Sequence, residues 1–143
     1  MDRQAIINRL LDHYERPRHY GPLAEADVTL PGGIPDCGDR VTVYLKVDPA
    51  DERVAALSFE GCGCTISQAA ASLLAEEFQG APLAAVIALD DEAVLTLLGR
   101  EVVQARPRCA TLALHTMQAA VLAYQRQRAH AGHADDGQPL RAP

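Results

Sequence analysis

A junction between a predicted strand and a predicted helix constrains this chain most strongly, because it carries two cysteines one residue apart. Residues 59–67 read FEGCGCTIS, and Cys62 and Cys64 are separated by Gly63. A helix N-terminus presents unpaired backbone N–H groups and the positive end of the helix dipole, which favour a thiolate held there. Thiolates bind metals and attack sulfur, so we interpret the junction as a reactive site. Taken alone, the pair also fits two buried structural cysteines, since free cysteine behaves as a small hydrophobe.

Length and charge exclude several classes of protein. A chain of 143 residues suits one domain with an ordinary core. Its net charge of −6, without a basic block and without tryptophan, argues against a nucleic-acid partner. Residues 1–20 lack the apolar core of a signal peptide, and no apolar run is long enough to cross a bilayer. We expect a cytoplasmic protein with no membrane partner, where reduced thiols indicate metal or thiol chemistry before disulfides.

Hydrophobic periodicity predicts a small antiparallel meander among helices. Apolar residues alternate with polar ones over 41–47, which is the pattern of a half-buried strand, and a turn at 48–51 leads into a returning strand. A loop dense in turn formers precedes the first of these strands. The predicted helices are 3–15, 66–78, 82–89, 90 or 91 to 98, and one beginning at Pro107; the strands are 27–30, 41–47 and 54–60; the turn-rich loop is 31–39. Residues 1–128 form the expected domain, and 129–143 the expected disordered tail.

The predicted hairpin brings distant thiols together. Because the second strand returns antiparallel, the Cys62 and Cys64 loop should lie beside the loop that carries Cys37 and Asp39. Cys109 follows Pro107 closely and should occupy the first turn of a helix, whose dipole would favour its thiolate too. Three thiol loops and one carboxylate supply enough ligands for one tetrahedral ion, and suit zinc or an iron–sulfur cluster.

Other candidate ligands are weaker. His13 and His19 lie on a surface helix and a linker, where histidines are expected to be solvated, and Met117 and His115 are expected to be core or flank residues. The sequence contains no glycine-rich phosphate loop, no Gly-x-Ser-x-Gly elbow and no His-Glu-x-x-His. It also lacks the paired Cys-x-x-Cys knuckles of a structural zinc finger. A dispersed site with a spare thiol suits ligand exchange and the acceptance of sulfur from a persulfide.

Three motifs in order resemble a known family. The segments PDCGD at 35–39, GCGCTIS at 61–67 and RCATL at 108–112 are similar to the three cysteine motifs of the iron–sulfur assembly proteins IscU, SufU and the N-terminal domain of NifU. The likeness spans roughly residues 5 to 125 and is nearest to SufU, because Arg108 stands where IscU has histidine. The resemblance implies an α+β fold, with a three-stranded antiparallel sheet packed by helices.

The resemblance also implies a site and a function. The implied metal ligands are Cys37, Asp39, Cys64 and Cys109, with Zn²⁺ as the cofactor, or alternatively Fe²⁺ or a [2Fe–2S] cluster. The implied function is that of a SufU-like zinc-bound sulfurtransferase, which accepts persulfide sulfur from a SufS-type cysteine desulfurase on Cys109 and passes it to a downstream scaffold or acceptor apoprotein. Cys62 falls at the IscU-type ligand position and Cys64 at the SufU-type position, so Cys62 is a second acceptor or an alternative ligand.

Two other functions stay open at this stage. On the same residues an IscU-like scaffold would assemble a transient [2Fe–2S] cluster, and a zinc-stabilised adaptor would carry out no transfer at all. Whether the chain is an enzyme depends on the choice among these three. Ile34 replaces the asparagine that usually opens the first motif, and the chain has no Leu-Pro-Pro-Val-Lys segment near 102–108, so we expect no dedicated Hsp70 interaction.

Overall fold

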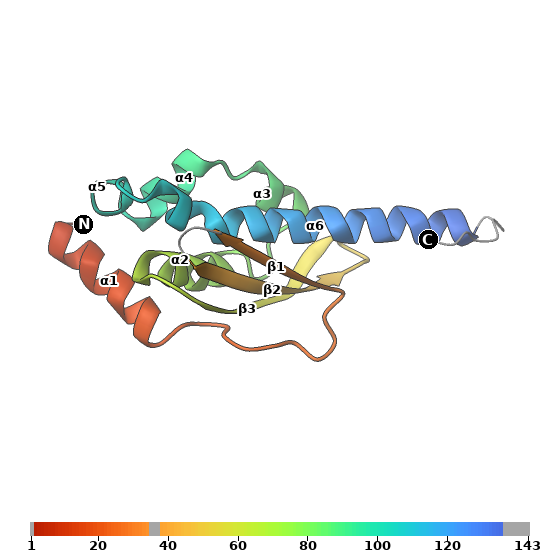
Figure 1. Cartoon of the computed structure of the whole chain (residues 1–143). Helices are drawn as coiled ribbons and strands as arrows, with labels where there is room; N and C mark the ends of the chain where they lie inside the picture. The colour runs from red at the N-terminus through yellow and green to blue at the C-terminus, as the bar shows by residue number, and fades with distance from the viewer. Residues whose placement is uncertain (1, 35–37, 136–143) are drawn as a thin grey trace.

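The chain folds into a three-stranded sheet with helices packed against one face and beside it (Figure 1). The computed structural model describes residues 2–34 and 38–135, and side chains as far as residue 130. The elements in chain order are α1 Arg3–Glu15, β1 Val28–Ile34, β2 Asp39–Asp48, β3 Arg53–Cys62, α2 Thr65–Glu77, α3 Leu83–Ala88, α4 Asp91–Leu98, α5 Arg100–Val103 and α6 Pro107–Asp135. The predicted α+β class is therefore confirmed.

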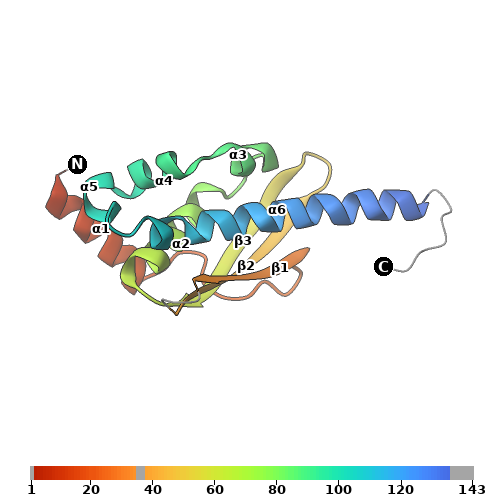
Figure 2. The ribbon, with the colours of Figure 1, turned by 45° about the horizontal axis from the view of Figure 1, so that its top comes forward.

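The sheet is antiparallel with the order β1-β2-β3, as expected for a meander. In β2 the buried residues alternate, because side chains along a strand point to opposite faces. The inner face packs against the buried sides of α2 and α6, which cover the sheet (Figure 2). Its largest buried members are Val41, Val43, Leu45, Leu57 and Phe59. This core holds the ends of β2 and β3 in a fixed register, on which the site depends.

Strand β1 is longer than predicted. Residues 31–34, assigned to a turn-rich loop from the sequence, pair with β2, and Ile34 lies opposite Asp39. Pro31 is tolerated because β1 is an edge strand. Gly32 is required by packing, since a Cβ there would lie 2.1 Å from Thr116 Oγ1 on α6. The rest of the predicted loop, residues 35–37, lies outside the described residues.

Helix α6 is also longer than predicted. It continues to Asp135, past residue 129, the expected start of a disordered tail. Tyr124 is its last described buried residue, and residues 125–130 are exposed, so this part of α6 extends away from the rest of the fold (Figure 1). Residues 136–143 lie outside the described residues. Among those described, no helix combines the length and apolar character that crossing a bilayer requires.

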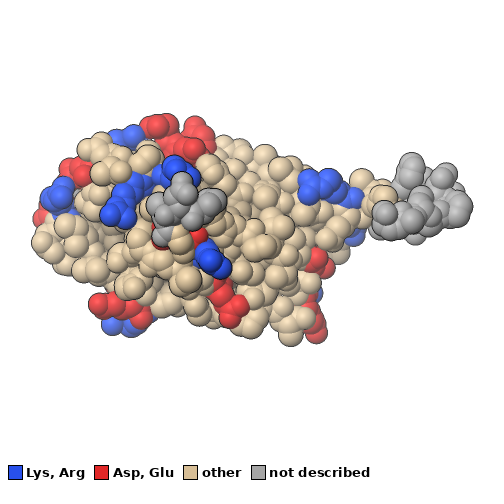
Figure 3. Space-filling model, in the orientation of Figure 1, with Lys and Arg blue, Asp and Glu red and all other residues tan. Residues whose placement is uncertain are grey.

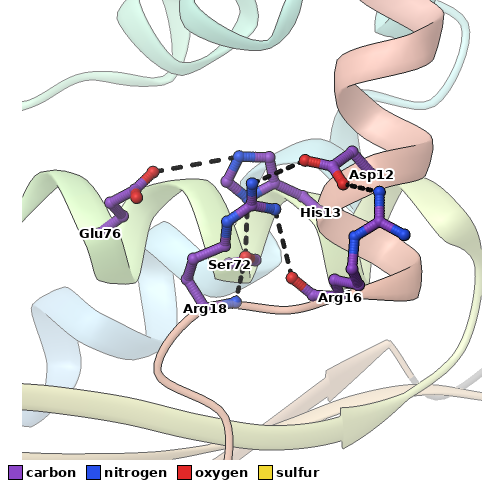
Figure 4. Close-up of polar contacts among 6 residues, drawn as sticks. All are labelled: Asp12, His13, Arg16, Arg18, Ser72 and Glu76. Atoms are coloured by element: carbon purple, nitrogen blue, oxygen red, sulfur yellow. Dashed lines mark hydrogen bonds and ion pairs between the residues drawn. The ribbon is translucent and has the colours of Figure 1, made fainter.

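Helix α1 docks on α2 through a buried polar contact (Figure 4). His13 is only 4% exposed, and its Nδ1 lies 2.7 Å from Ser72 Oγ. The backbone N–H of Arg18 donates to the same Ser72 oxygen at 2.9 Å. The expectation that His13 is solvated was therefore wrong, because the helix face that carries it turns toward α2.

Candidate metal and thiol site

Three predicted ligands from three elements meet at one end of the sheet. Asp39 is the first residue of β2, Cys64 is the N-cap of α2, and Cys109 lies in the first turn of α6. One ligand atom from each, the two sulfurs and a carboxylate oxygen, lie within 4.8 Å of one another. Residues 25 and 45 positions apart thus share one small volume at the meeting point of β2, α2 and α6.

The β2–β3 register explains why Asp39 and Cys64 meet. Arg40 pairs with Cys62 across the two strands, so the start of β2 lies beside the end of β3, as predicted from the hairpin. Gly63 then makes the turn into α2 with φ of +139°, a conformation that side chains rarely adopt. A Cβ at Gly63 would lie 2.4 Å from Asp39 Oδ1. Glycine at this position therefore lets the carboxylate approach the backbone closely.

Asp39 is a buried carboxylate that several donors stabilise. Its Oδ1 accepts a hydrogen bond from the Cys64 backbone N–H at 3.0 Å, and its Oδ2 lies 3.4 Å from Cys64 Sγ. Burial raises the pKa of Asp39, but hydrogen bonds from Cys109, from the backbone and thiol of Cys64, and from Ser67 outweigh burial and lower it overall. The site thus carries a fixed negative charge, which attracts a cation. Ser67 was missed as a contributor; its position three residues into the helix after Cys64 was the available signal.

Without a bound cation, the surroundings of Cys109 keep its thiol protonated. Cys109 is 5% exposed, and burial, together with smaller contributions from Asp39 and Cys64, raises the pKa of its thiol to about 12. The sequence predicted a Cys109 thiolate, but burial beside a carboxylate instead raises the pKa of this thiol. A cation held at the three ligand atoms would instead favour the Cys109 thiolate, because coordination deprotonates a thiol.

Cys64 has two structural roles at the start of α2. Its sulfur accepts the backbone N–H of Ser67 at 3.4 Å, so the side chain caps the helix. The same sulfur lies against the Asp39 carboxylate. Cys64 thus serves both as the N-cap of α2 and as a candidate metal ligand. This agrees with the prediction that Cys64 stands at the helix start.

Cys62 and Cys37 are the two remaining predicted site residues. Cys62, the last residue of β3, is exposed and lies outside the group of three ligand atoms. Cys37 lies outside the described residues. The ligand roles of Cys37, Asp39, Cys64 and Cys109 stay predictions, and the structure brings three of the four together.

The donor set fits one small cation. Tetrahedral zinc, with a Zn–S distance of about 2.3 Å and a Zn–O distance of about 2.0 Å, places neighbouring ligand atoms roughly 3.5 to 3.8 Å apart. The Cys64 Sγ to Asp39 Oδ2 distance is 3.4 Å, and all three ligand atoms lie within 4.8 Å. Zinc and iron both accept thiolate and carboxylate ligands, so the donors fit a metal without selecting one.

Comparison with known proteins places the chain in a family. The family model described as "NifU-like N terminal domain" matches residues 6–131. The chain belongs to this family. It is thus a member of a family of iron–sulfur cluster assembly scaffold proteins, as the three cysteine motifs indicated.

Curated relatives carry two different names at equal identity. The chain is 30% identical over 120 residues to an iron–sulfur cluster assembly scaffold protein IscU of Archaeoglobus fulgidus, covering 84% of this chain and 76% of that protein. It is 30% identical over 129 residues to the zinc-dependent sulfurtransferase SufU of Bacillus subtilis, covering 78% and 86%. The comparison therefore supports the family without separating SufU from IscU.

Solved structures share the fold. A protein of Fervidobacterium islandicum AW-1, described as an iron–sulfur cluster assembly scaffold for the SUF system, matches with a TM-score of 0.67 at 22% identity, covering 84% of this chain and 99% of that one. The N-terminal part of a NifU-like protein from Brucella abortus matches with a TM-score of 0.69 at 22% identity, covering 85% and 98%. At this identity the likeness shows the fold alone.

Proposed function

We propose that this protein is a zinc-bound, SufU-like sulfurtransferase that accepts sulfur from the persulfide of a SufS-type cysteine desulfurase. The observation that carries the proposal is the donor set, in which Asp39, Cys64 and Cys109 offer ligand atoms within 4.8 Å of one another. This spacing suits a single tetrahedral ion better than a two-iron cluster, whose ligands divide between two metals. The zinc-dependent sulfurtransferase of Bacillus subtilis is 30% identical to this chain and supports the same function.

The residues divide the work of such a protein. Asp39, Cys64 and Cys109, with Cys37 as the predicted fourth ligand, would hold the zinc, and a bound zinc ion would stabilise its coordinating sulfurs as thiolates. Asp39 contributes the fixed negative charge, since hydrogen bonds lower its pKa despite burial. The predicted acceptor is Cys109, with Cys62 as a second thiol. Because Cys109 is 5% exposed, acceptance there requires movement of the first turn of α6.

A desulfurase assay tests the proposal. Zinc-loaded protein is incubated with a SufS-type desulfurase and L-cysteine, and the desulfurase alone serves as the control. We expect faster alanine production and sulfur added to thiols of this chain, found by mass spectrometry after alkylation. Unchanged alanine production, with no added sulfur on any cysteine, would rule the proposal out.

A scaffold function is the second candidate, and the IscU relatives favour it. The scaffold of Archaeoglobus fulgidus is as similar to this chain as the sulfurtransferase of Bacillus subtilis. On this account the same thiols and Asp39 would receive iron and sulfide as substrates. Anaerobic reconstitution with iron and sulfide should then give a stable visible chromophore, and a colourless product would count against the scaffold.

A further inference from the structure

Among the described cysteines, Cys62 is the one that neither packs in the core nor caps a helix. Cys109 is buried against Asp39, and Cys64 caps α2 and contacts the same carboxylate. Cys62 instead is exposed at the end of β3. Residues two apart in a strand share a face, but the +139° φ of Gly63 breaks the strand, so Cys64 turns into the site while Cys62 faces solvent. The two cysteines of one motif thus have different surroundings.

A pocket opens beside Cys62. It has a volume of about 540 Å³, and its lining includes Tyr14, Pro17, Tyr20, Phe59, Cys62 and Gln68. Tyr14 and Tyr20 are 42% and 51% exposed, so both residues are accessible from solvent. The pocket therefore offers a wall of mixed polar and apolar character that includes two tyrosine side chains, with the Cys62 thiol in its lining.

The linker after α1 builds that wall. It runs parallel to β3, where the Gly21 N–H donates to the Phe59 carbonyl at 2.8 Å and the Phe59 N–H donates to the His19 carbonyl at 3.1 Å. The Tyr20 ring meets the Phe59 ring edge to face, with centroids 5.2 Å apart, and its hydroxyl donates to the Gly61 carbonyl at 3.3 Å. These contacts hold Tyr20 next to Gly61, the residue before Cys62.

We infer that Cys62 is the thiol that first receives sulfur, and that the pocket holds the donor's persulfide-bearing segment while Asp39, Cys64 and Cys109 remain together as metal ligands. This inference rests on the proposed function and changes its first step. Sulfur can then arrive without the first turn of α6 opening. It arrives two residues from Cys64, at the rim of the metal site.

The transfer needs no further reagent. The Cys62 thiolate attacks the outer sulfur of the donor persulfide R–S–SH, so that a new S–S bond forms at Cys62 Sγ and the S–S bond of the donor breaks. The electron pair of the broken bond goes to the inner donor sulfur, which leaves as a thiolate and takes up the proton that Cys62 released. The balance is Cys62–SH plus R–S–SH giving Cys62–S–SH plus R–SH.

Peptide mapping of the unaltered protein is the first test. Trypsin separates Cys109, on the peptide 109–126, from Cys62 and Cys64, on the peptide 54–100. After a short incubation with a SufS-type desulfurase and L-cysteine, followed by alkylation, we expect the mass of one added sulfur on peptide 54–100, at Cys62 by fragmentation. First labelling at Cys64 or on peptide 109–126 would overturn the inference.

Matched serine variants separate this inference from the proposed function. Cys62→Ser should keep its zinc and its fold, while sulfur loading falls at least about tenfold, because the transfer needs a thiolate nucleophile. Cys109→Ser should lose zinc affinity and still load sulfur at Cys62. Normal loading of Cys62→Ser, with sulfur on Cys109, would refute the inference and leave the proposed function standing; no loading of the unaltered protein would refute both.

A third variant tests the pocket. Tyr20→Ala should slow sulfur loading from the desulfurase and leave loading from glutathione persulfide unchanged, because the small donor does not need the wall. Tyr20→Phe keeps the ring against Phe59 and should load at the rate of the unaltered protein. Equal desulfurase-dependent rates for Tyr20→Ala and Tyr20→Phe would show that the pocket does not receive the donor segment.

Discussion

Asp39 shows how one residue links the parts of the site. Its two oxygens contact the backbone and the sulfur of Cys64, and the sulfur of Cys109 lies within 4.8 Å of the same carboxylate. The three candidate ligands could be named from the sequence, because thiols and a carboxylate in turn-rich segments are recognisable metal donors. The protonation of Cys109 could not, since it depends on burial that only the packed fold defines.

Removing the Asp39 carboxylate should weaken metal binding. We expect Asp39→Ala to lower zinc affinity at least about tenfold, because one ligand and its hydrogen bonds are lost together. Competition with a chromophoric chelator measures the change. Asp51→Ala is the control, since it removes the same charge from an exposed position in the hairpin between β2 and β3. Equal zinc affinities for the two variants would contradict the role of Asp39.

Gly63 should tolerate no side chain. Gly63→Ala places a Cβ 2.4 Å from Asp39 Oδ1 at a φ of +139°, so both the carboxylate and the backbone must shift. Gly80→Ala is the control, because Gly80 also has a positive φ, +77°, but its Cβ would meet nothing within 4 Å. We expect both variants to lose roughly 1 to 3 kcal/mol of unfolding free energy from backbone strain. Only Gly63→Ala should also lose zinc, and zinc retention by Gly63→Ala would contradict the geometry.

At the scale of elements, the predicted helices and strands agree with the structure where periodicity is strong. Helix α2 and the β2–β3 hairpin lie within a few residues of their predicted bounds. Sequence reasoning failed where tertiary packing decides: β1 extends through two glycines because α6 lies against it, and α5 was not foreseen. The burial of His13 on α1 was likewise invisible, because it depends on which face of α1 meets α2.

The contact between α1 and α2 should make stability depend on pH. Because the Arg18 N–H donates to Ser72 Oγ, the Ser72 hydroxyl can donate to a neutral His13 Nδ1. Burial and the nearby Arg18 charge lower the pKa of His13, although Glu76 at 4.0 Å, and Asp12, oppose them (Figure 4). His13 therefore binds a proton less readily in the folded chain than in the unfolded chain, where a histidine titrates near pH 6.5.

The free energy of unfolding should consequently fall as the pH drops below about 6.5, with a slope of at most about 1.4 kcal/mol per pH unit from this one group. Urea unfolding at a series of pH values measures the slope. His13→Asn should reduce it, while His130→Gln, at an exposed position on α6, should leave it unchanged. An identical slope in His13→Asn and the unaltered protein would show that His13 does not resist protonation.

Ser72 should be sensitive to truncation for the same reason. Its fully buried hydroxyl serves both His13 and the Arg18 N–H. Ser72→Ala leaves both groups without this partner, and should cost roughly 1 to 3 kcal/mol of unfolding free energy. Ser58→Ala is the comparison, since Ser58 is also buried but donates to one partner, the Gly21 carbonyl. A smaller loss at Ser72 than at Ser58 would argue against a shared hydroxyl.

At the scale of the whole molecule, one sheet and the faces of α2 and α6 supply the core, and the site lies where their ends meet. Charges of both signs occur on the face shown in Figure 3. The family and the fold class could be predicted, because three motifs in order carry them. The full extent of α6 could not, because residues 125–130 are exposed and give the sequence no buried face to mark them.

Truncation tests where the folded unit ends. A chain ending at Arg128 should keep the melting temperature of the full chain, because the described residues after Tyr124 are exposed. A chain ending at Ala119 should melt at a clearly lower temperature, because it lacks Ala120, Val121 and Tyr124, which are buried in the core. Equal melting temperatures for the two truncations would contradict the packing of α6.

The central claim is that Asp39, Cys64 and Cys109 share one metal ion. Zinc stoichiometry of proteins purified without added metal tests it most directly, in the unaltered chain and in its Cys62→Ser and Cys64→Ser variants. One zinc per chain is expected in the unaltered protein and in Cys62→Ser, and a clear loss in Cys64→Ser. Zinc retained in full by Cys64→Ser and lost from Cys62→Ser would contradict the account.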